Sequence, residues 1–278
     1  DDPSNEPSTM PAHEEDRLIL EAESLRVWFP GKTDIWGRAR THTKAVDNVS
    51  FQIRSGETLG LVGESGCGKT SLGRALLGLL PIASGRLNVM GKDVSGWDKK
   101  AWRDLRREVQ VVFQDPYSSL NPRMTVGEAI LEPMTVHGIH GSRKQRRDSV
   151  MALLEKVDLR PEHYQRYPHE FSGGQRQRIG IARALALDPD FIVFDESVSA
   201  LDVSVQSKVL NLINDLKREY RFTSLFISHD LGVVRYISDR VLVMEKGRIV
   251  EEGPVETVFN HPVQEYTRRL IESSPKLQ

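Results

Sequence analysis

The pattern of apolar and polar positions along the chain predicts strands and helices in alternation. Partial alternation near the start, and short apolar runs further on, predict strands at residues 18–29, 44–53, 58–62, 85–90, 191–194, 224–228, 240–244 and 248–251. Helical character predicts helices at residues 69–80, 99–107, 203–220 and 231–237. Strands that alternate with helices indicate a mainly parallel sheet with right-handed crossovers.

The middle and the ends of the chain differ from this pattern. Residues 115–188 are predicted to form a helical subdomain, with helices at 126–137, 142–157 and 175–186. Residues 1–17 are acidic and rich in Pro and Ser, which predicts a disordered tail. The expected main domain spans 18–255, and a helical extension spans 256–278. Because the first residue is not Met, a processed chain, a trimmed chain and one half of a longer tandem protein stay open.

The net charge and the lengths of the apolar runs exclude some classes of protein. A formal net charge of -1 and a pI of about 6.8 argue against a nucleic-acid partner, which would need a broad basic surface. The basic run at residues 143–147 is expected to be a solvated helix face. No run approaches the roughly 18 apolar residues of a membrane-spanning helix, so any membrane span must come from other chains.

Residues 63–70 fit the phosphate-binding pattern G-x-x-x-x-G-K-[ST]. Glycines let the backbone turn its N–H groups toward phosphate oxygens, and the following helix start adds donors. Lys69 is expected to reach the β- and γ-phosphates, Thr70 to ligate Mg²⁺ and Ser71 to touch the α-phosphate. A flexible surface loop is the alternative, which the position between a predicted strand and a predicted helix disfavours. The expected nucleotide contacts here are Gly63, Ser65, Gly66, Cys67, Gly68, Lys69, Thr70 and Ser71.

Cys67 is the one cysteine of the chain and has two interpretations. The favoured one is a small filler residue. The other is a reactive thiol, because a helix N-terminus lowers the pKa of a thiol. On that interpretation, alkylation would inhibit ATP hydrolysis and ATP would protect the thiol.

Two acidic residues, Asp195 and Glu196, follow the apolar run 191–194. A buried strand delivers such carboxylates to its carboxyl end, where ligands bind in open α/β sheets. Asp195 is then expected to hold Mg²⁺ through water, and Glu196 to orient or deprotonate the attacking water. An acid at a strand end is often a helix N-cap, but the upstream phosphate loop favours the functional interpretation.

Ser172, Gly173, Gly174 and Gln175 immediately precede a predicted helix. Ser172 suits an ordinary N-cap, yet two glycines beside a helix start also make an anion site. These four residues match the SGGQ core of the ABC signature, between the phosphate loop and the acidic pair. By this order of motifs the chain resembles the ABC ATPases over about residues 18–275.

The resemblance implies an α/β fold of the P-loop NTPase type. Its parts would be a RecA-like, mainly parallel sheet core, an antiparallel β subdomain and an inserted α-helical subdomain. It also implies ATP and Mg²⁺ as cofactors and hydrolysis of ATP as the activity. ATP would lie between two subunits arranged head to tail, with the SGGQ segment of one closing over the γ-phosphate held by the other. Hydrolysis by a single chain is then expected to be weak.

Four further positions of the family are filled. Gln114 matches the Q-loop glutamine that senses Mg²⁺ or water; it could also be an ordinary polar loop residue. Asp202 matches the D-loop at the dimer interface, with a turn and N-cap as the alternative. His229 matches the switch histidine on the γ-phosphate, although a lone histidine is usually unremarkable in function. Phe29 resembles the aromatic residue that stacks on adenine, but the adjacent Trp28 leaves this assignment open.

Residues 114–126 and 261–267 look like parts of the ATPase subunits of oligopeptide and dipeptide importers. Glutathione, nickel and microcin importers share much of these stretches, so the solute stays open. The implied partners are a second ATPase subunit, suggested to be a different chain, transmembrane permease subunits docking near residues 124–140, and indirectly a periplasmic or extracellular solute-binding protein. The implied location is peripheral, at the cytoplasmic face of the inner membrane.

Three rival functions stay open from the sequence. An ABC ATPase of DNA repair or chromosome work usually carries coiled-coil insertions or DNA-binding surfaces, and none is visible here. A translation-type ABC protein carries two cassettes, whereas this chain has one. A regulatory module that binds nucleotide without hydrolysis is disfavoured by the intact set of Asp195, Glu196 and His229.

Overall fold

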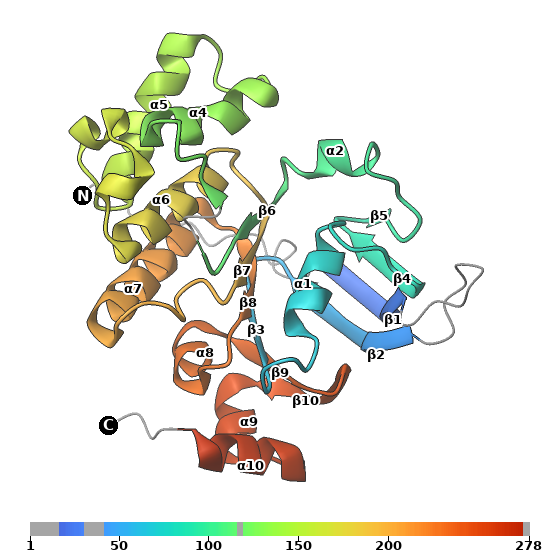
Figure 1. Cartoon of the computed structure of the whole chain (residues 1–278). Helices are drawn as coiled ribbons and strands as arrows, with labels where there is room; N and C mark the ends of the chain where they lie inside the picture. Colours follow the sequence, from blue (N-terminus) through green and yellow to red (C-terminus); the bar gives the residue numbers. More distant parts are fainter. Residues whose placement is uncertain (1–16, 31–41, 116–118, 275–278) are drawn as a thin grey trace, which may run out of the picture.

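In a computed structural model of the chain, the described residues are 17–30, 42–115 and 119–274 (Figure 1). Of the acidic segment 1–17, only Arg17 belongs to them. Residues 116–118 of the stretch that resembles peptide importers, and residues 275–278 of the extension, also lie outside the described residues.

Two sheets form among the described residues. The parallel sheet has the order β10-β9-β3-β8-β7-β6, with only the edge pair β9 and β10 antiparallel. The antiparallel sheet has the order β2-β1-β4-β5. The strands are β1 (Leu18–Pro30), β2 (His42–Arg54), β3 (Thr58–Val62), β4 (Ser84–Val89), β5 (Lys92–Asp93), β6 (Val109–Val112), β7 (Phe191–Asp195), β8 (Thr223–Ile227), β9 (Arg240–Glu245) and β10 (Arg248–Pro254).

Strand β3 leads into the phosphate loop and lies between β8 and β9 inside the parallel sheet. In this register Leu61 is opposite Ile227 on one side and Leu242 on the other. Because β3, β7 and β8 run in the same direction, their carboxyl ends meet at one edge of the sheet. The loops that carry the phosphate-binding pattern, the acidic pair and the candidate histidine therefore start from the same edge.

Each face of the parallel sheet is covered by its own helices. Successive side chains of a strand point to opposite faces, so Phe191 and Val193 of β7 pack in one hydrophobic cluster with Leu72 of α1, whereas Ile192 and Phe194 pack in another. That second cluster also includes buried residues of α6, α7 and α8. Figure 1 shows the same division, with α1 on one side of the sheet and α6 and α7 on the other.

The helices of the described chain continue the alternation with the strands. They are α1 (Lys69–Leu76), α2 (Trp102–Leu105), α4 (Val126–Val136), α5 (Arg143–Lys156), α6 (Gly173–Leu185), α7 (Val203–Tyr220), α8 (Leu231–Ile237), α9 (Val255–Asn260) and α10 (Glu265–Ser273), with 3-10 turns at η1 (Pro161–Gln165) and η2 (Pro168–Glu170). The helices α4, α5 and α6 form the helical subdomain inserted between β6 and β7 (Figure 1).

Capping boxes fix the starts of α4 and α5. Thr125 accepts a hydrogen bond from the N–H of Glu128, whose carboxylate accepts one from the N–H of Thr125. Ser142 and Gln145 repeat the arrangement at the start of α5. Such boxes satisfy N–H groups that a helix start leaves free. Both helices consequently begin within one residue of the positions that the sequence predicts.

Two expectations about elements were wrong, and one strand of the parallel sheet was not expected. Helix α1 ends at Leu76 rather than at residue 80, because Gly78 takes φ 63°, a left-handed conformation that ends a helix. Within the predicted helix 99–107, only Trp102–Leu105 is α-helical. Strand β6 (Val109–Val112) was not predicted, since four residues that follow a charged segment give little periodic signal.

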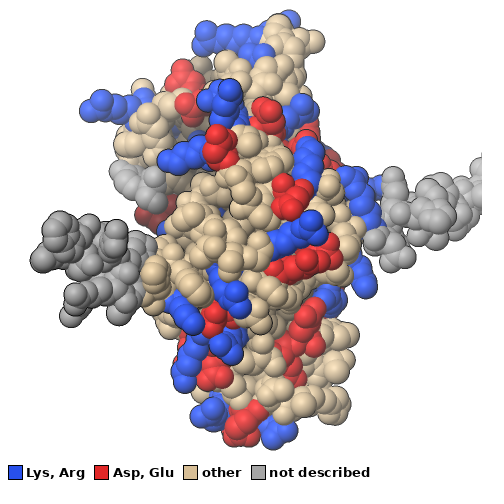
Figure 2. Space-filling view, turned by 90° about the vertical axis from the view of Figure 1, so that its right-hand side faces the viewer, with Lys and Arg blue, Asp and Glu red and all other residues tan. Residues whose placement is uncertain are grey.

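The surface carries both signs of charge. Figure 2 shows Lys and Arg side chains interspersed with Asp and Glu over one face, without a continuous field of one sign. No helix in the described ranges combines the length and the apolar composition that a bilayer span requires.

Candidate active site

The phosphate loop connects β3 to α1 and depends on its glycines. Gly68 takes φ 114° and Gly66 takes φ 79°, conformations that residues with a side chain rarely adopt. A Cβ atom on Gly68 would lie 2.1 Å from the carbonyl oxygen of Ala45, and one on Gly63 would lie 2.2 Å from that of Met244. Glycine at these places lets the loop sit directly on neighbouring backbone.

Lys69 lies inside the loop at the first position of α1. The residue is 4% exposed, and its Nζ donates to the carbonyl oxygens of Gly63 at 2.8 Å and Glu64 at 3.0 Å. The ammonium group thus spans the loop and holds its first two residues through their carbonyl oxygens. At the same place the free N–H groups of the helix start carry partial positive charge. Together they make an anion-binding site suited to phosphate.

Cys67 is a buried filler in this loop, as the favoured interpretation had it. The residue is 8% exposed, and burial raises the pKa of its thiol despite the nearby ammonium of Lys69. A higher pKa means less thiolate at neutral pH, so the reactive-thiol interpretation loses its physical basis.

Alkylation of Cys67 is therefore expected to be slow. At pH 7.5 we expect iodoacetamide to label the folded chain at least about tenfold more slowly than the same chain in urea, because the folded thiol is both buried and less ionised. Since the chain has one cysteine, mass spectrometry of the intact protein reports this rate directly. Equal rates in the two conditions would contradict the buried position.

Thr70 and Asp195 come from different elements and meet beside the loop. The hydroxyl Oγ1 of Thr70 donates to Oδ1 of Asp195 at 3.2 Å. Asp195 is 6% exposed at the end of β7, and burial raises the pKa of its carboxyl, an effect that the hydrogen bond from Thr70 opposes. A hydroxyl and a carboxylate side by side are oxygen ligands of the kind that Mg²⁺ takes, so this pair fits a magnesium ion.

Glu196 stands at the same edge in a strained backbone conformation. Its φ is 50°, and its N–H donates to the carbonyl oxygen of Ile227 at 2.9 Å, which ties it to β8. His229 follows β8, and its Nδ1 lies 3.5 Å from Oε2 of Glu196. Strain of this kind at a non-glycine residue is typical of functional sites. The carboxylate of Glu196 and the imidazole of His229 are therefore neighbours at this edge of the sheet.

A contact that the sequence did not predict joins Gln114 to this group. Nε2 of Gln114 donates to Oγ of Ser199 at 3.2 Å, and that hydroxyl donates to the carbonyl oxygen of Glu196 at 2.8 Å. Gln114 follows β6, at the entrance to the helical subdomain. Ser199 thus links the start of this subdomain to the backbone of the acidic pair.

The serine-glycine segment lies elsewhere in the chain. Ser172 caps α6, where its Oγ accepts from the N–H of Gln175 at 3.3 Å and its own N–H donates to Oε1 of Gln175 at 3.0 Å. Gly174 lets α6 approach α7 closely, because a Cβ there would lie 2.3 Å from Cγ1 of Val205. Asp202 is the N-cap residue of α7. The helix that Ser172 caps, α6, and the helix that follows the phosphate loop, α1, cover opposite faces of the sheet (Figure 1).

The two candidate aromatic residues lie at the end of β1. Phe29 is half-buried and packs against the hydrophobic cluster that contains α1. The ring of Trp28 has the Nζ of Lys44 at 5.1 Å from its centroid and the ring of His42 at 6.0 Å. Because both rings make protein contacts, the choice between them as the adenine-stacking residue stays a prediction.

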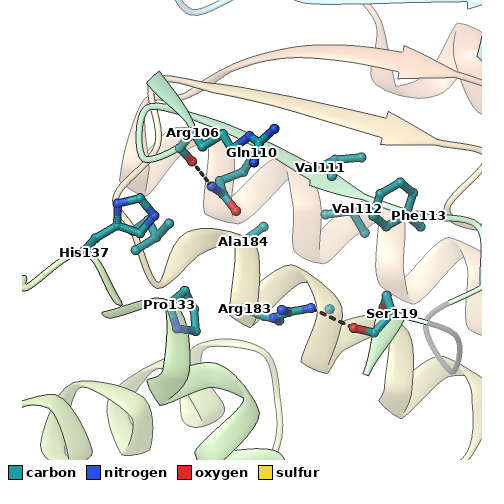
Figure 3. A pocket seen from close by; sticks show the side chains of 12 residues that line it. Arg106, Gln110, Val111, Val112, Phe113, Ser119, Pro133, His137, Arg183 and Ala184 are labelled. Atoms are coloured by element: carbon teal, nitrogen blue, oxygen red, sulfur yellow. Dashed lines mark hydrogen bonds between the residues drawn. The ribbon is translucent and has the colours of Figure 1, made fainter. Parts of the chain in front are cut away.

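A separate cavity of about 290 Å³ lies between β6 and the helical subdomain (Figure 3). Arg183 of α6 crosses it and donates to the carbonyl oxygen of Ser119 at 2.7 Å. Pro133 of α4 and His137, which follows that helix, line another side. None of the phosphate-loop residues lines this cavity, so it is distinct from the candidate nucleotide site.

Several proteins are similar in sequence to this chain over nearly its whole length. The chain is 49% identical over 265 residues to the oligopeptide transport ATP-binding protein OppF of Salmonella typhimurium, with 94% of this chain and 79% of that protein covered. It is 51% identical over 257 residues to the putative oligopeptide transport ATP-binding protein YkfD of Bacillus subtilis, with 92% and 76% covered. It is 50% identical over 268 residues to the glutathione import ATP-binding protein GsiA of Pectobacterium atrosepticum, with 96% and 42% covered.

Solved structures and a family description agree with these relatives. The dimeric post-hydrolysis state of the ATP-binding cassette MJ0796 bound to ADP and Pi matches with a TM-score of 0.75 and 26% identity, over 85% of this chain and 98% of that one. The structure of cbiO1 from Clostridium perfringens, part of the ABC transporter complex cbiONQ, matches with a TM-score of 0.75 and 26% identity, over 88% and 92%. Residues 46–199 match the family described as ABC transporter. The chain therefore belongs to the ABC transporter family, among the ATP-binding proteins related to those of oligopeptide importers.

Proposed function

We propose that this chain hydrolyses ATP to power the import of peptides, or of related small solutes such as glutathione or nickel, by an ABC importer at the inner membrane. The observation that carries the proposal is identity of 49–51% over more than nine tenths of the chain to importer ATP-binding proteins. The geometry around the phosphate loop supplies the groups that such hydrolysis needs. The experiment that tests the proposal is the affinity capture of permease subunits by the tagged chain.

The phosphate groups of ATP bind at the loop in this proposal. The N–H groups at the start of α1 and the ammonium of Lys69 neutralise charge on the β- and γ-phosphates. Ser71 lies two residues further along the same helix and faces the α-phosphate. Gly63, Ser65, Gly66, Cys67 and Gly68 contribute backbone, and Phe29 stacks on adenine.

Thr70 and Asp195 would hold Mg²⁺, and Gln114 would be a further ligand or would contact the water bound to the ion. When bound, the ion neutralises charge on the phosphate oxygens as phosphoryl transfer proceeds. Asp195 is buried next to Thr70, so this chain presents the two oxygen donors already paired.

Glu196 accepts a proton from the attacking water or orients it, and His229 supports the γ-phosphate. The water attacks the terminal phosphorus, the bond between the β–γ bridging oxygen and that phosphorus breaks, and ADP and inorganic phosphate result. The placement of His229 3.5 Å from Glu196 supports a joint role at one reacting centre.

A second ATPase subunit completes the site in the proposal. Ser172, Gly173, Gly174 and Gln175 of one subunit approach the γ-phosphate held by the other, and Asp202 lies at the interface between them. The position of α6 supports this, because α6 and α1 cover opposite faces of the sheet within one chain. MJ0796, a related cassette, is dimeric in its solved structures.

The permease is proposed to dock beside the cavity of Figure 3. Val136, at the end of α4, is 75% exposed and immediately precedes His137 of the cavity wall. Single exposed apolar side chains are common on protein surfaces, so the choice of this surface rests on the resemblance to importer ATPases, which implies docking near residues 124–140. Gln114 lies between β6 and this subdomain. A movement of the subdomain on docking would therefore reach the backbone of Glu196 through the hydrogen bonds of Ser199.

Replacing Val136 by Asp is expected to lower the capture of transmembrane permease subunits by about tenfold or more, because a buried unpaired charge opposes docking. The measurement is affinity purification of the tagged chain from detergent-solubilised membranes, with partners identified by mass spectrometry. Leu79→Asp is the matched control, since Leu79 is an apolar residue, 46% exposed, that follows α1 outside the helical subdomain. Capture of no membrane protein by the unaltered chain would contradict the proposed function, and equal capture by both variants would contradict the docking surface.

A further inference from the structure

The C-terminal extension touches the phosphate loop at Glu64. The backbone N–H of Glu64 donates to the phenolic oxygen of Tyr266 in α10 at 3.1 Å, across 202 positions of sequence. The carbonyl oxygen of Glu64 accepts from Nζ of Lys69 at 3.0 Å and from the N–H of Cys67 at 3.2 Å. Both backbone polar groups of Glu64 are therefore engaged. The peptide unit that links Gly63 to Glu64 donates this N–H to Tyr266, and its carbonyl oxygen, that of Gly63, accepts from Nζ of Lys69 at 2.8 Å.

Tyr266 is held firmly enough to act as a support. The residue is 8% exposed and packs in the same hydrophobic cluster as Val243 of β9 and Val258 of α9. Burial raises the pKa of its phenol, so the hydroxyl stays protonated. The segment before α10 is anchored as well, because the carboxylate of Glu251 on β10 accepts from the N–H groups of the two residues that precede Glu265, at 2.8 and 3.0 Å.

The hairpin between β9 and β10 supports the loop from the same side. The N–H of Gly247 in its turn donates to the carbonyl oxygen of Cys67 at 2.8 Å. The carbonyl oxygen of Met244 would lie 2.2 Å from a Cβ on Gly63, so the backbone of the hairpin packs directly against the backbone of the loop's first residue. The hairpin and α10 thus contact the phosphate loop at three residues, Gly63, Glu64 and Cys67.

We infer that the C-terminal extension is a structural part of the nucleotide site, and that Tyr266 is a positioning residue for the phosphate loop. This inference rests on the proposed function, since it assigns the loop a nucleotide to bind. Tyr266 fixes the peptide unit between Gly63 and Glu64, the Gly63 carbonyl oxygen of that unit holds the ammonium of Lys69, and the ammonium faces the phosphates. By linkage, nucleotide that binds the ordered loop stabilises the docked position of α10 in return.

Replacing Tyr266 by Phe tests this link, because it keeps the buried ring and removes only the hydroxyl that accepts from Glu64. We expect the Kd for Mg–ATP to rise about three- to tenfold, the factor that corresponds to one lost neutral hydrogen bond. In the assembled transporter, the KM for ATP should rise by the same factor with kcat within about twofold, because Glu196 and His229 are unchanged. Amide exchange at Glu64 should become about tenfold faster.

Tyr236→Phe is the matched control, since the hydroxyl of Tyr236 donates to Asn211 on the surface of the chain. Both variants should melt close to the parent protein, which separates a local effect on the loop from a general loss of stability. An unchanged Kd and unchanged Glu64 exchange in Tyr266→Phe, with ATP binding by the parent intact, would overturn the inference alone. Absence of ATP binding by the parent would instead overturn the proposed function. A Glu64 amide unprotected in the parent chain would also overturn the inference, whether or not the variant folds.

Discussion

Replacement of Glu196 by glutamine is expected to lower the rate of ATP hydrolysis by about 10²–10⁴-fold, the usual contribution of a general base. The amide keeps the size of the side chain but cannot accept the proton of the attacking water. The change leaves Lys69 and the loop untouched, so ATP should bind with an affinity close to that of the parent. With hydrolysis stopped, the ATP-bound pair of subunits should accumulate, and sedimentation should detect it.

The measurement is phosphate release in the assembled transporter, together with the Kd for ATP. Glu219→Gln serves as the control, because Glu219 is an exposed acid on α7 that pairs with Lys156. Turnover of Glu196→Gln near that of the control would refute the role proposed for Glu196. A loss of ATP binding in the same variant would show that the carboxylate serves the loop rather than the water.

Replacement of Lys69 by methionine is expected to weaken ATP binding by about 100-fold or more. Methionine fills a similar volume but carries no charge, and charge-assisted hydrogen bonds to phosphate contribute about 1.5–3 kcal/mol each. The carbonyl of Glu64 keeps its bond from the N–H of Cys67, whereas the carbonyl of Gly63 loses its bond from Nζ, so the free energy of unfolding should fall by about 1–3 kcal/mol. The variant should therefore stay folded while its affinity for ATP is lost.

Isothermal titration with Mg–ATP measures the affinity, and thermal unfolding without nucleotide measures the stability. Lys208→Met is the matched control, because Lys208 is exposed on α7, away from the loop. Equal affinities in the two variants would mean that the ammonium of Lys69 braces the loop without contacting phosphate.

Much of the fold could be predicted because local signals agreed with the global pattern. The strand, glycine loop and helix of the phosphate site follow directly from apolar periodicity and from glycines that the structure requires at Gly63 and Gly68. The helices of the inserted subdomain carry capping boxes that are visible in the sequence, as at Thr125 and Ser142. Where such signals were short, as in the four residues of β6, the prediction failed.

The contacts that organise the candidate site could not be predicted, because they are non-local. Gln114 reaches Ser199 across 85 positions, and Glu64 reaches Tyr266 across 202. Hydropathy and spacing report only on neighbours within a turn or a strand. The phosphate pattern identified Lys69, for example, but not its bonds to the carbonyl groups of Gly63 and Glu64.

The interpretation of Cys67 shows how tertiary context decides chemistry. Its place beside a helix start suggested a lowered pKa, which is the effect of a dipole on an accessible thiol. In the folded chain the thiol of Cys67 is buried, and the desolvation outweighs the effect of the helix start and raises the pKa of the thiol. The balance between the two depends on burial, which the motif itself does not encode.

The most direct test of the account is equilibrium binding of ATP to the unaltered chain, with and without Mg²⁺, alone and with its partner subunits. The account predicts saturable binding that weakens at least about tenfold when EDTA removes the metal, since Thr70 and Asp195 lose the ion they share with the phosphates. Binding that is absent under all of these conditions, or indifferent to the metal, would contradict it.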